Sequence, residues 1–214
     1  PDIIVSYVIM PRMNRYKLCK TIKEDINISH IPVILLTARD DRQSQISGYK
    51  NGADGYLSKP FEVEMLMELI RNRLKNREYT KKRYLNAGLI PTPEESTISL
   101  TDETFLIKLN SIIQENIENS NLGIQFICQE VGLGRSSLYN KLKALTGMGA
   151  NEYISKLRIE KAITLISGTD MPFSEIAEKT GFTTPSYFST AFKQYTGETP
   201  SQYKERKKKG LADK

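Results

Sequence analysis

Two nearly continuous apolar runs place the strongest constraint on the fold of the N-terminal third. Asp2–Met10 (DIIVSYVIM) and Ile31–Ala38 (IPVILLTA) are rich in β-branched side chains. Such runs are typical of strands that are buried on both faces of a sheet. A short third strand is expected in DGYLSKPF, residues 54–61, and segments with helical spacing separate the three. Strands that alternate with helices imply an α/β arrangement with a parallel sheet and right-handed crossovers.

The helices of this part are predicted at residues 16–26, 42–51 and 63–74, with Gly52 closing the second. Residues 77–100 contain two prolines, a glycine and no sustained period. We therefore expect a mostly extended linker there. Four apolar side chains near the third strand are expected in the core: Leu57, Phe61, Met65 and Leu69.

From Thr101 onward the pattern is helical, and Thr101 is a candidate N-cap. The first helix should bury one face, and about six more helices follow, near residues 124–131, 136–145, 151–167, 173–180, 185–195 and 201–207. Two helix–turn–helix units are visible, with turns at residues 132–134 and 181–183, and they align as a degenerate repeat. The joining helix is expected to be about 25 Å long, which with its turns approaches the roughly 34 Å between successive major-groove faces. The face of the first helix consists of Phe105, Leu109, Ile112, Ile113 and Ile117.

The charge distribution points to a polyanionic partner for the C-terminal part. The 214 residues carry a net charge of +6, and residues 135–214 contain 14 basic and 8 acidic side chains. Residues 102–134 contain 1 basic and 5 acidic side chains. A basic region beside helix–turn–helix units favours nucleic acid as the partner.

Other function classes are disfavoured by composition. His30 is the only histidine, and Cys19 and Cys128 form no CxxC pair, so we expect no metal, no cofactor and no catalytic residues. No apolar run approaches the roughly 18–20 residues that a membrane helix needs, and no leader opens the chain. We therefore expect a cytoplasmic protein that is not an enzyme and makes no contact with a membrane.

The strings PDIIVSYVIMP, HIPVILLTA and GADGYLSKPF resemble the second half of a two-component receiver domain. The resemblance covers about 78 residues and implies the last three strands of a five-stranded, doubly wound α/β fold. It assigns the switch hydroxyl to Thr37 and the switch lysine to Lys59, and it implies a cis bond before Pro60. The position of the phosphoacceptor aspartate is occupied by Tyr7, and Asn14-Arg15 replaces the usual Asp-Gly.

These departures predict a receiver that does not transfer phosphoryl groups. A phenol cannot replace a carboxylate in acyl-phosphate chemistry or Mg²⁺ binding. The acidic pair belongs to the family's first strand, which this sequence lacks, so Asp2–Met10 would be a bare sheet edge. Three explanations stay open: the gene product is longer than this chain, as Pro1 in place of Met suggests, a partner covers the half-domain, or it is marginally folded.

The strings NEYISKLRIEKAITLI and SEIAEKTGF, with SYFSTAFKQYTGETPSQYK after them, resemble the AraC-type (AraC/XylS) DNA-binding domain. This resemblance covers about 110 residues and implies sequence-specific control of transcription, often through contact with RNA polymerase. Receiver and AraC-type domain together resemble a response regulator or the C-terminal end of a hybrid two-component sensor. Gly134 and Gly149 depart from the family at positions where Ser or Thr caps are common.

Outward-facing polar residues of the two recognition helices are the candidates for DNA contact. Asn140 has the groups to pair with an adenine edge, and Arg135 with guanine or phosphate. Arg158, on the connecting helix, is a candidate for either a phosphate contact or a salt bridge. In the second recognition helix Phe188 and Phe192 are expected in the core, and Thr184 as the N-cap. The full set of candidates is Arg135, Ser136, Tyr139, Asn140, Lys143, Ser186, Tyr187, Thr190 and Lys193.

These patterns predict a partial receiver at residues 1–79, a linker at 80–100, the AraC-type domain at 101–207 and a basic tail at 208–214. The expected function is a sequence-specific DNA-binding regulator of two-component type that binds double-stranded promoter or operator DNA. The alternatives are a receiver-derived interaction module, including a homodimer through residues 1–79, and a non-functional remnant of a longer hybrid sensor.

Overall fold

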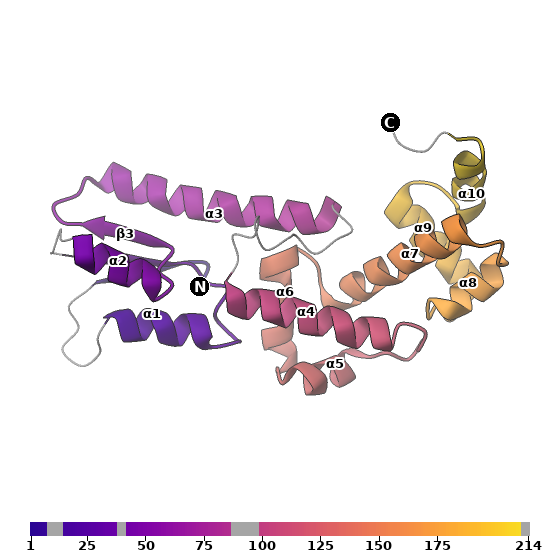
Figure 1. Ribbon diagram of the computed structural model, residues 1–214, viewed down its shortest axis with the longest axis horizontal. Helices are drawn as coiled ribbons and strands as arrows, with labels where there is room; N and C mark the ends of the chain where they lie inside the picture. The colour runs from indigo at the N-terminus through magenta and orange to yellow at the C-terminus, as the bar shows by residue number, and fades with distance from the viewer. Residues whose placement is uncertain (8–14, 38–41, 87–98, 211–214) are drawn as a thin grey trace. The chain divides into compact units, whose positions relative to one another are not determined.

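The computed structural model describes residues 1–7, 15–37, 42–86 and 99–210 (Figure 1). Its sheet contains three strands, β1 (Ile4–Tyr7), β2 (Val33–Thr37) and β3 (Gly55–Ser58), in the order β1-β2-β3. Both pairs are parallel, as the alternation of strands and helices predicts. The predicted strand residues 8–10 and 38 lie outside the described part of the chain.

Helices cover both faces of this sheet (Figure 1). Helices α1 (Arg15–Glu24) and α2 (Arg42–Lys50) lie on one face, where Cys19 and Ile22 pack with Val33 and Leu35. Helix α3 (Val63–Asn86) covers the other face. Its residues Leu66, Leu69 and Ile70 pack against a buried cluster of Ile34, Leu36 and Leu57. The alternating apolar strand residues thus meet a helix layer on either side, which explains why the strands carry no polar face.

Two predictions about α3 are wrong. The helix does not end at Leu74 but runs to Asn86, so residues 77–86, which were expected to be extended, are helical. Met65 is 60% exposed and is not a core residue. The buried side of the helix is formed by Leu66, Leu69 and Ile70. Met65 precedes Leu66 by one residue and so lies about 100° away from it around the helix, outside the buried side. Residues 87–98 of the expected linker lie outside the described part.

The seven helices expected after residue 100 are present. Helix α4 begins one residue before Thr101, so Thr101 is not the N-cap. The Ser99 side chain accepts a hydrogen bond from the Asp102 backbone N–H at 3.2 Å and takes that role. The Thr101 hydroxyl instead donates to the carbonyl of Lys23 at 2.8 Å. The helices are α4 (Leu100–Glu115), α5 (Ile124–Val131), α6 (Arg135–Thr146), α7 (Ala150–Gly168), α8 (Phe173–Lys179), α9 (Pro185–Thr196) and α10 (Pro200–Lys208).

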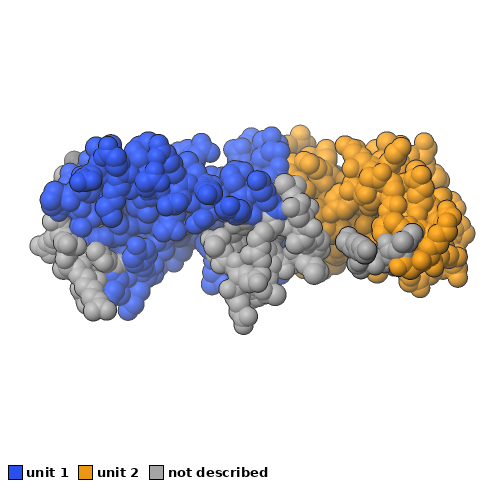
Figure 2. All heavy atoms as spheres, turned by 90° about the horizontal axis from the view of Figure 1, so that it is seen from above, with its two compact units in different colours: residues 1–107, 136–147 blue, residues 108–135, 148–214 orange. Residues whose placement is uncertain are grey.

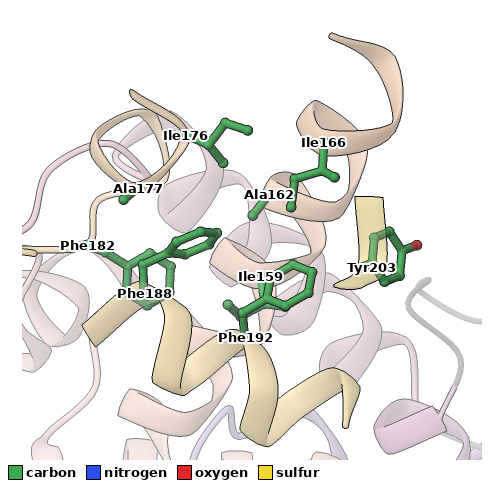
Figure 3. Close-up of a cluster of buried hydrophobic side chains, with 9 residues drawn as sticks. All are labelled: Ile159, Ala162, Ile166, Ile176, Ala177, Phe182, Phe188, Phe192 and Tyr203. Atoms are coloured by element: carbon green, nitrogen blue, oxygen red, sulfur yellow. The ribbon is translucent and has the colours of Figure 1, made fainter. Parts of the chain in front are cut away.

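The predicted core of the second helix–turn–helix unit is confirmed. Phe188 and Phe192 have no exposed surface and stack edge-on with ring centroids 5.7 Å apart. Figure 3 shows them beside Ile159 and Ala162 of α7 and Ile176 of α8. Four helices, α7 to α10, therefore share one apolar cluster, and α9 is held in it by its two phenylalanines.

The chain divides into two compact units (Figure 2). The first contains Pro1–Ile107 and Ser136–Gly147, and the second contains Lys108–Arg135 and Met148–Lys214. Nearly all of α6, the first of the two predicted recognition helices, thus belongs to the same unit as the receiver-like sheet. The predicted domain boundaries at 79, 100 and 207 stay predictions.

Candidate nucleic-acid interface

Helix α6 has one apolar face and one polar face. Leu138, Leu142 and Leu145 are buried, as the leucine spacing predicts. Four of the candidate DNA-contacting residues lie on the opposite side, where their side chains are exposed: Ser136, Tyr139, Asn140 and Lys143. Their spacing of three, four and seven residues places them on a common stripe of the helix surface. The stripe offers hydroxyl, amide and ammonium groups, which are the donors and acceptors that read base edges and phosphates.

A groove of about 510 Å³ borders this stripe within the first unit. Tyr139, Asn140 and Lys143 line it together with Arg77 and Lys81 of α3. The last two were not among the candidates, although the basic run after Leu74 is visible in the sequence. The Arg77 Nε donates to the carbonyl of Ala144 at 3.5 Å, which links α3 to α6.

Arg135 begins α6 and is exposed. Its Nε and Nη2 both donate to the Oε1 of Gln125 in α5, at 3.1 and 2.9 Å. The guanidinium is therefore oriented by a neutral partner, and its charge is not neutralised by this contact. A guanidinium that is positioned by a neutral partner has the geometry that guanine or a phosphate requires.

Helix α9, like α6, has a buried apolar side and an exposed polar side, and its first turn is defined by an N-cap and a proline. Thr184 is its N-cap, as predicted, and accepts from the Tyr187 backbone N–H at 3.2 Å. Pro185 occupies the first helical position, where its missing N–H costs nothing. The four candidate residues of this helix are exposed: Ser186, Tyr187, Thr190 and Lys193.

Two of these side chains already have local contacts. The Thr190 hydroxyl donates to the carbonyl of Ser186 at 3.1 Å. The Tyr187 ring packs edge-on against Phe182, with centroids 5.7 Å apart. The packing fixes the ring direction and leaves 54% of Tyr187 exposed. An aromatic side chain that is anchored at one edge and open at the other can contact a base or sugar without losing much conformational freedom.

Arg158 fulfils neither of its predicted roles. It is 8% exposed, and its Nη2 donates to the carbonyl of Asn119 at 2.7 Å. Its guanidinium carbon lies 6.0 Å from the Phe182 ring centroid. Burial lowers the pKa of this guanidinium. Arg158 therefore joins the end of the α4 region to the α8–α9 turn and faces away from solvent.

The receiver-like residues meet at the carboxyl ends of the strands. Tyr7, Thr37 and Ser58 end β1, β2 and β3, and Thr37 pairs with Ser58 in the register. The Lys59 backbone N–H donates to the Thr37 carbonyl at 2.7 Å, and the Lys59–Pro60 bond is cis, as the resemblance implies. The Lys59 ammonium lies 4.3 Å from the Tyr7 ring centroid. Asn14 lies outside the described residues.

Residues 1–7, 15–37, 42–86 and 99–210 contain no cluster of three or more His, Cys, Asp or Glu side chains that could hold a metal ion. Within the same ranges, no helix is both long enough and apolar enough to cross a membrane.

Comparison with known protein families gives two matches. Residues 1–71 match the response regulator receiver domain, and residues 127–206 match a helix-turn-helix domain. "Histidine kinase P4" of Formosa agariphila is 43% identical over 206 residues, which are 96% of this chain and 15% of that protein. This chain therefore spans a small part of that relative's length.

Two further similarities concern regulators. "Probable transcriptional regulator ycf29" of Pyropia yezoensis is 28% identical over 162 residues, covering 71% of this chain and 73% of that protein. The C-terminal domain of AraT, a response regulator from Geobacillus stearothermophilus, is 32% identical, with a TM-score of 0.45 over 47% of this chain and 84% of that chain. A receiver domain followed by a helix-turn-helix domain is a regulator architecture. By these matches residues 1–71 form part of a response regulator receiver domain, and a helix-turn-helix domain follows them at residues 127–206.

Proposed function

We propose that this chain is the DNA-reading part of a two-component transcriptional regulator, with α6 and α9 as its two reading helices. The observation that carries the proposal is the shared construction of these helices. Each has an exposed polar stripe on one side and wholly buried apolar side chains on the other. Burial fixes the rotation of each helix, so the stripe is presented in one orientation, as base readout requires.

The chemistry of the exposed residues assigns their roles. The Asn140 amide carries a donor and an acceptor that match the adenine edge. Arg135 pairs with guanine or phosphate, and the Lys143 and Lys193 ammonium groups contact phosphates, where point charges suffice. Ser136, Tyr139, Ser186, Tyr187 and Thr190 complete the surface.

For the receiver-like part, the proposal is that this chain is not phosphorylated at the acceptor position. Tyr7 occupies the acceptor position and is 56% exposed, with the Lys59 ammonium over its ring. A phenol offers no carboxylate for an acyl phosphate or for Mg²⁺. Contact with RNA polymerase, dimerisation through residues 1–79 and a cytoplasmic location belong to the same proposal.

The experiment is selection of bound sequences from a random DNA pool, followed by titration of the selected DNA and a scrambled version at several salt concentrations. We expect tight, salt-dependent binding that prefers the selected sequence. Asn140→Ala should cost about 1–3 kcal/mol on the selected DNA and relax selectivity at one position. Lys193→Ala should weaken binding to both sequences and reduce the salt slope by about one.

The matched control for Lys193→Ala is Lys108→Ala. Lys108 is an exposed lysine of α4, outside both reading helices. Its replacement removes the same charge and should leave the salt slope unchanged. Binding that does not distinguish selected from scrambled DNA would show that the chain is not a sequence-specific reader.

A further inference from the structure

A buried charged network lies inside the first unit. The Ser29 hydroxyl donates to the Asp102 carboxylate at 2.7 Å, and the Lys141 ammonium donates to the Ser29 hydroxyl at 2.7 Å. The same ammonium forms an ion pair with Asp102. Lys141 and Ser29 have no exposed surface, and Asp102 is 2% exposed. A lysine without solvent contact is rare unless it is paired, so these partners are what keep the ammonium inside.

The three residues come from three separate elements. Ser29 lies between α1 and β2 of the receiver-like part, and Asp102 lies in the first turn of α4. Lys141 is in α6, 112 residues from Ser29 along the chain. The network therefore joins the receiver-like part to a helix that carries candidate DNA-reading residues. The contact from Arg77 of α3 to the Ala144 carbonyl lies on the same flank of α6.

The network restrains the rotation of α6. Lys141 directly follows Asn140 and precedes Lys143 by two residues. Successive residues lie about 100° apart around a helix, and their relative positions are fixed by its backbone. Any rotation of the helix that moves the buried Lys141 therefore also moves those two exposed side chains. The Lys141 ammonium also lies 5.1 Å from the Phe105 ring centroid, so its site has an apolar wall that admits little displacement.

A buried ion pair of this kind adds little net stability. Removing charges from water offsets most of their mutual attraction, so an apolar pair of similar size would be about as stable. Burial lowers the pKa of Lys141 even though the Asp102 carboxylate acts in the opposite direction. An apolar contact would tolerate sliding and rotation, whereas an ammonium with a hydroxyl and a carboxylate partner fits in one geometry.

We propose that Ser29 and Asp102 are positioning residues for DNA reading, because they hold α6 through Lys141 in the rotation that presents Tyr139, Asn140 and Lys143. The receiver-like part is then a mount for the first reading helix, independent of phosphoryl transfer. The inference rests on the proposed function and adds to it a dependence of base selectivity on residues that do not contact DNA.

The test uses the full chain, its selected DNA, and two altered DNAs in which one half-site or the other is scrambled. Asn140→Ala first identifies the half-site that α6 reads. Ser29→Ala and the paired variant Asp102→Asn with Lys141→Met are then titrated against all three DNAs. The paired variant removes both charges at once, so it leaves no unpaired buried charge and should fold.

We expect both variants to lose about tenfold or more in affinity for intact DNA and for DNA that keeps only the α6 half-site. On DNA that keeps only the other half-site, their affinity should equal that of the wild type. A merely structural loss would weaken binding to all three DNAs, so the half-site comparison separates the two roles.

The matched control is Ser6→Ala. Ser6 is a buried serine of β1 in the same unit, and its hydroxyl donates to the neighbouring Tyr7 carbonyl, not to α6. This variant should read both half-sites as the wild type does. Folded Ser29→Ala and paired variants with wild-type selectivity at the α6 half-site would overturn the inference alone. A wild-type chain without selective binding would overturn the proposed function and this inference with it.

Discussion

The Lys59 ammonium lies over the face of the Tyr7 ring, 4.3 Å from its centroid. Tyr7 ends β1, and Lys59 directly follows β3, so the two residues meet at the carboxyl edge of the sheet. A cation over an aromatic face is attracted by the ring quadrupole, worth about 0.5–1 kcal/mol at an exposed site. The lysine thus has a partner that does not depend on a phosphoryl group.

This contact leads to a prediction about phosphorylation. Incubation with acetyl phosphate and Mg²⁺ should leave the mass of the protein unchanged, because the acceptor position offers a phenol and its lysine is engaged with the ring. Intact-mass spectrometry checks the result, with Tyr7→Leu as the control that removes the phenol. The added mass of a phosphoryl group on an Asp or Glu of either protein would contradict the prediction.

A single methyl group added at Gly181 should destabilise the protein severely. Its φ is +70°, and an added Cβ would lie 2.2 Å from the Ile117 carbonyl oxygen and 2.9 Å from the Arg158 guanidinium. Gly181→Ala should therefore lower the free energy of unfolding by about 3 kcal/mol or more, from the left-handed backbone and the overlap together. Urea denaturation measures it.

Gly132→Ala is the matched control for Gly181→Ala. Gly132 has nearly the same φ, +73°, but an added Cβ would have no neighbour within 4 Å. Only the backbone term remains, so the cost should be about 1 kcal/mol. Equal losses in the two variants would show that the contact with Ile117 and Arg158 is unimportant.

His30 should make the first unit sensitive to acid. It lines a cavity of about 110 Å³ with Lys23, Arg73 and Arg77, and its Nδ1 is buried without a hydrogen-bond partner. Burial, with the nearby Lys141 charge, lowers the pKa of His30 to about 4. An unfolded histidine titrates near 6.5, so the unfolded chain binds the extra proton between these values and stability falls as the pH falls from 6.5 to 4.

The size of the effect follows from the shift. Between pH 7 and pH 5 the wild type should lose about 2 kcal/mol more than His30→Gln, whose side chain does not titrate. Urea titrations of both proteins at the two pH values give the comparison, and the carboxylates contribute equally to each. If the two proteins lose the same unfolding free energy, titration of His30 is not the cause of the acid sensitivity.

Thr184 should stabilise the second reading helix through its cap. Thr184→Ala removes the hydrogen bond to the Tyr187 backbone N–H and should cost about 1 kcal/mol of unfolding free energy. The adjacent Thr183 is exposed and lies outside the helix, so Thr183→Ala is a control with the same chemical change. Thermal unfolding should show a lower midpoint for Thr184→Ala alone.

The sequence was informative where one residue's environment is set by its near neighbours. Leucine and phenylalanine spacing predicted which sides of α6 and α9 are buried, and Thr184 before Pro185 predicted a helix start. Helix α3 shows the limit of that approach. After Leu74 most of its residues are polar, so the apolar period weakens. Good helix formers continue, and the Lys81–Glu78 pair supports the helix on its way to Asn86.

Lys141 shows a second limit. Its position between Leu138 and Leu142 is on the inner side of α6, but a lysine there is ordinarily expected to reach solvent. Its burial depends on Ser29 and Asp102, which lie 112 and 39 residues away along the chain. No local pattern links such distant residues, so the network could be found only in three dimensions.

The position of Asp102 also determines where this protein can be divided. The helix-turn-helix family match begins at residue 127, and a fragment cut there would keep Lys141 but lose both side chains that hold its ammonium. Such a fragment would have to expose the lysine or release its proton, and either change would alter the seating of α6. A boundary at residue 127 therefore separates a lysine from its counter-ion, and a continuous piece that keeps α6 with both partners of Lys141 begins no later than Ser29.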